Sequence, residues 1–301
     1  MSIDGKNTVI RLQGGLGNQM FQYAFGRALS LRNNSDLYLD VSALNPKKNR
    51  GYSLDNFLLN AKFATPPILK SAITPHFALK KKLWKALKIP FKYAPTHIVE
   101  KRFSYSAEIA ETKTSAYFDG YWQTEKYFAD CPDIIRGDFA FRNESELQKH
   151  PQYGEICGSD SVALHIRRGD YVKNPKYRKL LYVCTLEYYK RAIAYLRERH
   201  SGLKFFIASD DHKWVAENFD LSAEFRLIES KSAIEDFFLM SRCRHNIISN
   251  SSFSWWSAWL NGNPQKTVIA PDAWFAARAR MDYSDILPGG WIKIATTSQS
   301  K

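Results

Sequence analysis

Runs of apolar residues along the chain predict alternating strands and helices. Short apolar runs at residues 8–12, 36–41, 162–166 and 203–209 are typical of buried strands. Residues 20–31 and 186–199 place apolar side chains at helical spacing. The second half continues this alternation, with strands predicted at 225–228, 246–249 and 267–270 and helices at 214–219, 235–242 and 255–260. Such alternation in the second half favours an α/β fold with a Rossmann-like parallel sheet there.

The chain length allows two domains. Its 301 residues exceed the size of an average single domain. Residues 142–161 are polar and contain Pro151, Gly154 and Gly158, as linkers between domains often do. We therefore expect an N-terminal domain over residues 1–150 and a C-terminal domain over residues 151–301.

The stretch 162–172, VALHIRRGDYV, places two arginines directly after a buried strand. In open α/β sheets the ligand lies outside the carboxyl ends of the strands. Arg167 and Arg168 at that edge indicate an anionic ligand, because a guanidinium group matches phosphate oxygens with paired hydrogen bonds. The alternative is a surface network in which both arginines pair with Asp170 and nearby acids.

A glycine-rich turn, QGGLGNQ at residues 13–19, separates the first strand from the first helix. This order brings backbone N–H groups and a helix N-terminus toward an anion. The spacing is neither that of a dinucleotide fingerprint nor that of a Walker loop. A tight turn that needs glycine only for steric reasons is the alternative.

The composition shows a strongly basic net charge and only four cysteines. The net charge of +13 and the pI of about 9.4 favour a polyanionic or phosphorylated partner, or an anionic membrane surface. The four cysteines form no CxxC pair and the seven histidines show no metal-ligand spacing, so we expect no metal site and a reducing, cytoplasmic location. The N-terminus lacks the apolar core of a signal peptide, and no run is long enough to span a bilayer.

Residues 79–88 combine a leucine stripe with lysines. Leu79, Leu83 and Leu87 recur at helical spacing, and lysines flank them. This pattern predicts a helix that rests on an anionic membrane. A domain helix with a solvated lysine face is equally compatible with it.

The stretch 117–128, YFDGYWQTEKYF, interleaves aromatic and polar residues. Aromatic planes beside polar groups suit a sugar acceptor, so Asp119, Trp122 and Gln123 are candidate acceptor-binding residues. Plain burial of the aromatic side chains is the alternative. The stretch itself predicts a strand that leads into a turn and a helix start.

Together with this stretch, four motifs resemble the bacterial α-1,2-fucosyltransferases of glycosyltransferase family 11. The motifs are GGLGNQ at 14–19, HIRRGD at 165–170, FFIASDD at 205–211 and SNSSFSWW at 249–256. The resemblance covers residues 9–270. It implies a GT-B-like pair of Rossmann-type domains with a cleft between them, with the acceptor bound mainly by the N-terminal domain and the donor mainly by the C-terminal domain.

The resemblance also implies a reaction. It implies transfer of L-fucose from GDP-L-fucose to the 2-hydroxyl of a terminal β-galactoside, with inversion, without a metal and without another cofactor. The expected setting is synthesis of bacterial O-antigen or another surface glycan, on an acceptor that is free or lipid-linked. The absence of an Asp-x-Asp motif from the sequence agrees with metal independence. Arginine and backbone N–H groups would then neutralise the leaving diphosphate.

Residue roles carry over from the resemblance position by position. Arg167 matches the arginine on the donor β-phosphate, and Arg168 and Asp170 would support its loop. Catalytic candidates are Arg167, Asn18 and Asp170. The donor-binding candidates are Gly15, Gly17, Asn18, His165, Arg167, Asp210, Asp236, Asn250, Ser251, Ser252 and Phe253.

Three questions stay open on the sequence alone. The general base is unassigned among Asp170, Asp119 and Glu125. The acceptor beyond its terminal galactose and the oligomeric state are not encoded in any motif. Alternative functions are transfer of another GDP-sugar by a GT-B enzyme, or a non-catalytic protein that binds carbohydrate or nucleic acid.

Overall fold

The chain forms two compact units, Met1–Phe141 and Arg142–Lys301. The computed structural model describes residues 6–45, 51–72, 83, 86–87 and 94–296. The division between the units falls at the start of the polar stretch 142–161. We describe each unit by itself.

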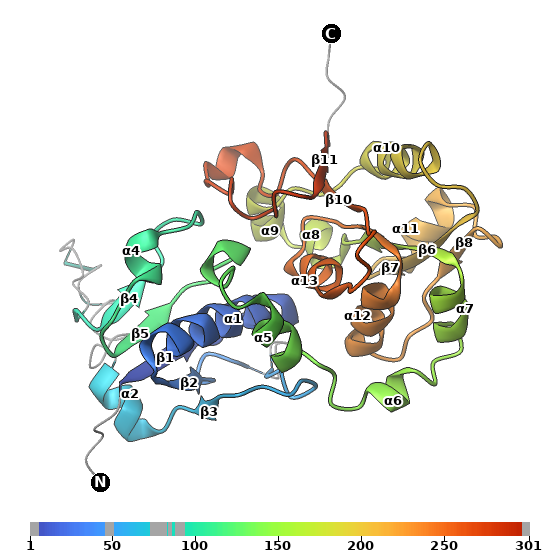
Figure 1. Ribbon diagram of the computed structural model, residues 1–301. Coiled ribbons are helices and arrows are strands. Elements are labelled where there is room, and N and C mark those ends of the chain that lie inside the picture. Colours follow the sequence, from blue (N-terminus) through green and yellow to red (C-terminus); the bar gives the residue numbers. More distant parts are fainter. Residues whose placement is uncertain (1–5, 46–50, 73–82, 84–85, 88–93, 297–301) are drawn as a thin grey trace. The chain divides into compact units, whose positions relative to one another are not determined.

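The first unit is built on a parallel five-stranded sheet of order β3-β2-β1-β5-β4 (Figure 1). The chain moves from β1 to β2 and β3 on one side and then returns to β4 and β5 on the other. The direction in which the chain adds strands to the sheet therefore reverses between β1 and β5. Open α/β sheets bind ligands at such switch points. The elements are β1 (Asn7–Arg11), α1 (Leu16–Asn33), β2 (Asp36–Asp40), β3 (Lys62–Phe63), α2 (Pro66–Ala72), β4 (His97–Val99), α4 (Ala107–Ala110), β5 (Ala116–Asp119), the 3₁₀ turn η2 (Glu125–Tyr127) and α5 (Pro132–Asp138).

Helix α1 is the central helix of this unit and is buried on most of its surface. Gly26 allows it to lie directly on the sheet, because a Cβ atom there would come within 2.3 Å of Ile10 on β1. Two glutamines on the buried side, Gln19 and Gln22, hydrogen-bond to loop backbone instead of to water. They satisfy backbone groups that the loops would otherwise bury unpaired.

The second unit is built on a parallel six-stranded sheet of order β11-β10-β9-β6-β7-β8. Here the chain switches direction between β6 and β9. The elements are α6 (Glu144–Leu147), α7 (Tyr153–Gly158), β6 (Asp160–Ile166), α8 (Gly169–Lys173), α9 (Pro175–Leu180), α10 (Leu186–Arg197), β7 (Leu203–Ser209), α11 (His212–Asn218), β8 (Phe225–Leu227), α12 (Ala233–Arg242), β9 (His245–Ile247), α13 (Ser252–Leu260), β10 (Val268–Pro271), η3 (Ala277–Ala279) and β11 (Ile292–Ile294).

Strand β6 is covered on both faces, which explains its continuous apolar sequence. Val162, Leu164 and Ile166 pack into one core cluster with the apolar side of α10. Because side chains alternate along a strand, Ala163 and His165 face the opposite side. The ring of His165 there lies 5.6 Å from the ring of Phe253, in the first turn of α13. The single polar residue in this run is thus directed toward the α13 N-terminus.

The α/β fold and most of the elements predicted from apolar periodicity are confirmed. The strand predicted at 203–209 is β7, and the helix predicted at 186–199 is α10, which ends at Arg197. The sequence did not indicate the short strands β3, β4 and β11 or the short helices α2 and α4 to α9. Two- and three-residue strands carry too few positions to show a period of two.

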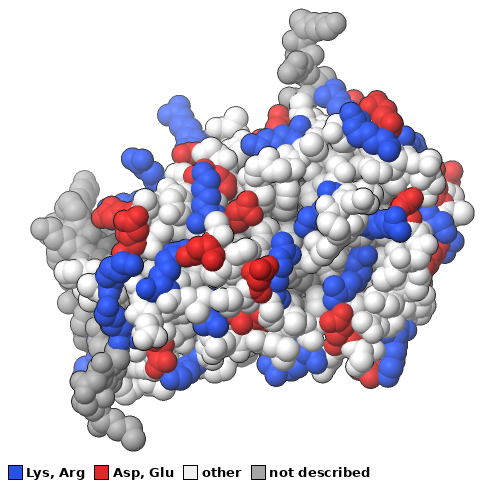
Figure 2. Space-filling view, in the orientation of Figure 1, with Lys and Arg blue, Asp and Glu red and all other residues white. Residues whose placement is uncertain are grey.

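The lysine-rich segment 79–88 lies for the most part outside the described residues. Its predicted contact with a membrane therefore stays a prediction, as does the cytoplasmic location. In the part of the chain that the structure describes, no helix combines the length and the hydropathy needed to span a bilayer. Basic and acidic side chains are interspersed on the face of the molecule in Figure 2, although the net charge is +13.

Candidate functional site

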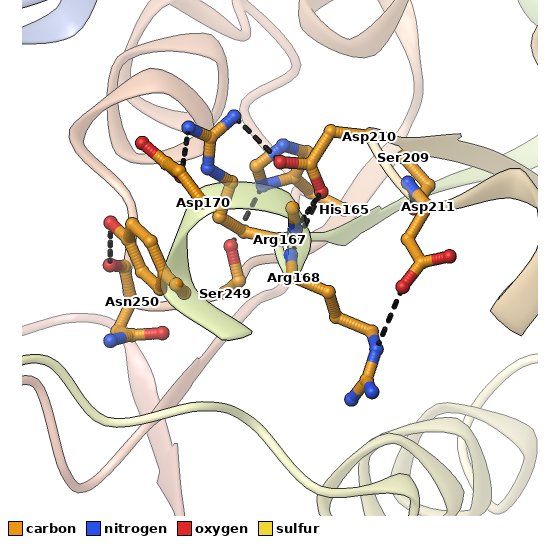
Figure 3. A network of polar contacts seen from close by, with 11 residues as sticks. His165, Arg167, Arg168, Asp170, Ser209, Asp210, Asp211, Ser249 and Asn250 are labelled. Carbon is orange, nitrogen blue, oxygen red and sulfur yellow. Dashed lines mark hydrogen bonds and ion pairs between the residues drawn. The ribbon is translucent and has the colours of Figure 1, made fainter. Parts of the chain in front are cut away.

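The turn from β6 into α8 holds Arg167 between two carboxylates (Figure 3). Its Nη2 atom lies 2.6 Å from Oδ1 of Asp170, and its Nη1 atom lies 2.9 Å from Oδ2 of Asp210. All three side chains keep between a quarter and a third of their surface exposed. The guanidinium group is therefore fixed at the carboxyl end of β6 and is accessible to an anion.

Asp210 organises this turn from the end of the neighbouring strand β7. Its Oδ1 atom accepts the backbone N–H groups of Arg168 at 2.8 Å and Gly169 at 3.0 Å, while Oδ2 pairs with Arg167. Gly169 lets Asp210 approach the turn closely, because a Cβ atom there would come within 2.4 Å of Oδ2 of Asp210 and would displace that carboxylate. An open hollow of about 560 Å³ borders this turn, lined by Gly169, Asp170, Lys173, Asn174, Pro175 and Asp210.

Arg168 is directed away from Arg167. Its Nε atom lies 3.3 Å from Oδ2 of Asp211, and its guanidinium carbon lies 4.4 Å from the centre of the Trp214 ring. The second arginine of the motif thus attaches the turn to α11 through an ion pair and a cation–π contact. The surface network that we considered for both arginines exists, and it involves each of them with different acids.

His165 is buried behind the turn as a neutral imidazole. Its Nδ1 atom lies 2.8 Å from the Oγ atom of Ser249, which follows β9. Burial, assisted by the positive charge of Arg167, lowers the pKa of His165 to about 3. The imidazole therefore carries no charge at neutral pH and offers hydrogen bonds only.

The turn between β9 and α13 lies beside His165, across the switch point of the second sheet. Asn250 is fully buried, and its side chain donates to the carbonyl groups of Tyr182 and Trp274. The hydroxyl group of Tyr171, from α8, donates to the carbonyl oxygen of Asn250. Asn250 is thus an internal brace of the turn. Ser251 precedes α13 as its N-cap residue, and the helix begins at Ser252 without an acidic residue in its first turn.

Asp236 lies in the first turn of α12, apart from the network around Arg167. Burial raises the pKa of its carboxyl above the usual range, although a hydrogen bond from Ser230 opposes the rise. Phe237, the next residue, packs with its ring 5.3 Å from that of Phe253. The two helices that carry Asp236 and Ser252 are therefore in contact.

In the first unit, the glycine loop places Asn18 at the start of α1. Gly14 adopts φ +82°, which only glycine adopts readily, and a Cβ atom there would come within 2.3 Å of the Asn18 amide. The Oδ1 atom of Asn18 accepts a hydrogen bond of 2.7 Å from Nε2 of Gln123, which follows β5. Two predicted residues that are 105 positions apart thus meet at the switch point between β1 and β5. Gly15 is the N-cap residue of α1, and Gly17 is buried in the first turn of that helix.

The other two acceptor candidates have partners within the unit. Asp119, at the end of β5, pairs with Arg11 at 2.7 Å. Burial alone would raise the pKa of Asp119, but His97 and the positive charge of Arg11 outweigh it and hold the pKa below its usual range. Trp122 is fully buried and stacks on Phe25 with ring centroids 4.5 Å apart. Its ring belongs to the core, as in the alternative of plain burial, and we assign it no acceptor contact.

Glu100, directly after β4, was not predicted as a site residue. Its carboxylate accepts the backbone N–H groups of Tyr121 at 2.7 Å and Trp122 at 3.0 Å. Burial raises the pKa of Glu100 to about 7, against the effect of those two hydrogen bonds. Because β4 is short and the residue stands outside every motif, the sequence offered no signal for it.

The described residues contain no group of three or more His, Cys, Asp and Glu side chains that would suit a metal ion. The charge that the site presents to a ligand comes instead from Arg167, backbone N–H groups and the α13 N-terminus. Such groups bind diphosphates and other multiply charged anions.

Comparison with known proteins agrees with this geometry. The sequence model named Glycosyl transferase family 11 matches residues 2–295. An Escherichia coli α-1,2-colitosyltransferase is 38% identical over 295 residues, which cover 95% of this chain and 98% of that protein. The O-antigen biosynthesis glycosyltransferase WbnK of Escherichia coli is 31% identical over 311 residues, which cover 94% of this chain and 99% of that protein.

Solved structures share the fold. The fucosyltransferase NodZ from Bradyrhizobium superimposes with a TM-score of 0.52 at 14% identity, over 84% of this chain and 93% of that chain. A structure of NodZ α-1,6-fucosyltransferase co-crystallized with GDP gives the same TM-score. At this identity the likeness concerns the fold alone, which is a GT-B-like pair of Rossmann-type domains.

Proposed function

Because the chain belongs to glycosyltransferase family 11, we propose that it transfers L-fucose from GDP-L-fucose to the 2-hydroxyl of a terminal β-galactoside, with inversion. The observation that carries the proposal is the fixed Arg167 at the carboxyl end of β6, held at 2.6 Å and 2.9 Å between Asp170 and Asp210. Such a guanidinium group suits the charge that develops on a leaving diphosphate.

The donor belongs to the second unit in this proposal. Arg167 binds the β-phosphate, and the N–H groups and hydroxyls of Ser251 and Ser252 at the α13 N-terminus bind the diphosphate. The carboxylate of Asp236 binds the guanine base, and its partial burial would strengthen a bond to the base N–H groups. His165, Phe253 and Asn250 shape the turn on which these groups lie.

The acceptor belongs mainly to the first unit. Gln123 is paired with Asn18 at the switch point of its sheet, and the side-chain amide of Gln123 suits a sugar hydroxyl. Asn18 keeps its predicted role in donor binding. Asp119 stays ionised beside Arg11 and is a further hydrogen-bond acceptor.

We propose that Asp170 is the general base that removes the proton of the acceptor hydroxyl. Its carboxylate pairs with Arg167 in this structure, and a diphosphate that takes over Arg167 would release it to act as a base. Asp170→Asn should then bind GDP at least as tightly as the wild type, because one carboxylate no longer competes for Arg167, but should transfer sugar about 10²- to 10⁴-fold more slowly. A variant with near wild-type transfer would return the role to Asp119 or Glu125.

One of the relatives indicates an alternative donor for this chain. The relative at 38% identity is a colitosyltransferase. Colitose is fucose without its 3-hydroxyl, so the two donors differ by one polar group. A site built to bind that hydroxyl would reject the colitosyl donor by about 10⁴-fold, whereas an apolar contact there would accept both.

The test is product formation from GDP-L-fucose and GDP-colitose, each with and without a chelator, over lactose, N-acetyllactosamine and Galβ1,3-linked N-acetylhexosamines. The linkage is read by NMR. An α-1,2-fucosyl product that forms equally well with chelator is expected. Preference for the colitosyl donor would replace the fucosyl assignment. Consumption of neither donor by a protein that binds GDP would reject both.

The setting of the reaction follows from the relatives in the same way. We place the enzyme in the assembly of O-antigen or a similar bacterial surface glycan, as the similarity to the O-antigen biosynthesis glycosyltransferase WbnK suggests. A lipid-linked acceptor would bring the substrate to a membrane surface, near which residues 79–88 are predicted to bind.

A further inference from the structure

The turn Gly120–Gln123, which follows β5, contains an unusual backbone conformation. Trp122 adopts φ +56°, in the left-handed region that bulky residues rarely occupy. Gly120 is packed so closely that a Cβ atom there would come within 2.5 Å of Glu100 and 2.7 Å of the Trp122 ring. Such conformations persist only where the surroundings enforce them, and they occur most often at functional sites.

The carboxylate of Glu100 is what holds this turn. It accepts two successive N–H groups, from Tyr121 and Trp122, with one carboxylate oxygen each. Successive N–H groups around a left-handed residue form a concave anion site, and here a side chain of the protein fills it. The backbone N–H of Glu100 also bonds the carbonyl oxygen of Asp119 at 2.9 Å, which fixes Glu100 at the end of β5.

Trp122 contributes no polar anchor of its own. Its indole N–H is buried and lacks a hydrogen-bond partner among the residues that the structure describes. The position of the turn therefore depends on Glu100 on one side. On the other side it depends on Gln22 of α1, whose amide donates to the Gly120 carbonyl at 3.0 Å.

We propose that Glu100 is a positioning residue for sugar transfer, because it holds the Gly120–Gln123 turn in the conformation that brings Gln123 to Asn18. The hydrogen bond of 2.7 Å between Gln123 and Asn18 is the structural result of this arrangement. The inference rests on the proposed function, in which those two residues meet the substrates.

The arrangement also makes transfer sensitive to pH. Burial, with a smaller contribution from the negative charge of Asp119, raises the pKa of Glu100 to about 7, so the carboxyl protonates close to neutral pH. A protonated carboxyl keeps one acceptor oxygen and gains an O–H donor, which faces the N–H donors of the turn. The ratio kcat/KM should therefore decline as the pH falls through 7.

The first experiment compares Glu100→Gln with the wild type and with Glu108→Gln, which changes an exposed glutamate of the same unit. Glutamine has the shape of glutamate but only one acceptor oxygen. At pH 8 we expect transfer by E100Q to fall about 10- to 100-fold, since small misplacements at a site have effects of that size. E108Q should behave as the wild type, and GDP affinity should stay within about twofold in both variants.

The pH profile distinguishes positioning from a merely structural role. In E100Q the decline between pH 8 and pH 6 should disappear, so that wild type and variant converge in acid. Glu100→Asp should restore a pH-dependent profile, because it restores an ionisable carboxyl. A decline that persists unchanged in E100Q would overturn the proposal.

A double-variant cycle tests the route through Gln123. If Glu100 acts by placing Gln123, then E100Q should add less than about twofold to the loss caused by Gln123→Ala alone. Losses that multiply in the double variant would mean that Glu100 acts independently, and would overturn the proposal. The melting temperature of each variant shows that the comparison is between folded proteins.

Amide exchange gives a readout that needs no substrate. The N–H groups of Tyr121 and Trp122 should exchange faster in E100Q, and faster in the wild type at pH 6 after correction for intrinsic rates. Unchanged exchange in E100Q would overturn the proposal even if transfer is observed. If the wild type transfers no sugar at all, the proposed function is refuted. The exchange measurement still tests whether Glu100 holds the turn.

Discussion

Arg167 shows how much one side chain depends on residues far from it in sequence. Its position directly after an apolar run made it predictable as an anion-binding residue. Its partner Asp210 was predicted as a donor-binding residue but not as a partner of Arg167, because nothing in the sequence states that β6 and β7 are neighbours. Once the strands pair in parallel, with Ile166 opposite Ser209, the residues that follow them meet. Sequence reasoning therefore misses contacts between residues that follow two neighbouring strands at the carboxyl end of a sheet.

Replacement of Arg167 by alanine should abolish most transfer while the fold persists. A single charge-stabilising donor in an active site contributes about 10²- to 10³-fold to the rate, and Arg167 supplies two donor nitrogens. We expect kcat to fall by at least that factor, measured as steady-state transfer at saturating donor. Arg191→Ala, which removes an exposed helical ion pair with Glu187 in the same unit, is the matched control. Transfer within tenfold of the wild type would remove Arg167 from its assigned role.

His165 should make the stability of the protein depend on pH below 6.5. Its pKa of about 3 in the folded chain lies below the value near 6.5 of an unfolded histidine, so the unfolded chain binds the proton more readily. The contribution is complete above pH 6.5 and is lost, by about 1.4 kcal/mol per pH unit, as the pH falls toward 3.

The measurement is urea unfolding of the wild type and of His165→Asn at pH 6.5 and pH 5. Asparagine can keep a hydrogen bond to Ser249 but does not titrate in this range. Between the two pH values the wild type should lose about 2 kcal/mol more than the variant. Equal losses in both proteins would show that the imidazole is protonated without penalty.

At the scale of elements, long apolar segments were predictable and short connecting ones were not. Strand β7 and helix α10 each repeat their pattern often enough to be recognised. Strand β4 has only three residues, His97–Val99, and takes its place from pairing with β5. Glu100 follows that strand, so the residue that we propose as a positioning residue was missed together with the element that places it. Trp122 shows a second limit: an aromatic residue in a polar stretch suits both a sugar surface and a core, and the sequence does not decide between them.

The turn between β6 and α8 should tolerate no side chain at Gly169. A methyl group there would come within 2.4 Å of Asp210 and would displace the carboxylate that fixes Arg167. We expect Gly169→Ala to reduce transfer about 10- to 100-fold, as misplacement of a catalytic group does. Gly158→Ala is the control, because a Cβ atom at Gly158 meets nothing within 4 Å. Similar transfer by both variants would show that the turn adapts to the extra methyl group.

At the scale of the whole molecule, the two units repeat one construction principle. Each has a parallel sheet whose strand order reverses beside its first strand, between β1 and β5 or between β6 and β9. In both, the candidate site residues lie at that point: Asn18 with Gln123, and His165 with Ser249. The alternation of strands and helices predicted the sheet of the second unit, and the family resemblance implied the sheet of the first. The sequence did not predict the order of their strands, which no local pattern encodes.

GDP should stabilise the molecule mainly through its second unit. With ligand at about 100 times its dissociation constant, linkage predicts about 2.7 kcal/mol of added stability. Hydrogen exchange of the full chain, with GDP and a chelator present, should slow most in residues 165–170, 209–214 and 249–256. Protection that requires a divalent cation would contradict metal-independent binding. Protection confined to residues 1–141 would move the nucleotide to the other unit.

The two carboxylates on Arg167 have a consequence for selectivity and turnover. They act as an internal competitor, so an incoming anion gains only the difference between its own contacts and those that it displaces. Inorganic phosphate, with few other contacts, would seldom displace them, whereas a nucleotide sugar that is also held by its base and by the α13 N-terminus would. After transfer the same carboxylates return to the arginine as GDP leaves. The ion pairs that Arg167 makes before the donor binds would thereby exclude inorganic phosphate. They would also speed the release of GDP.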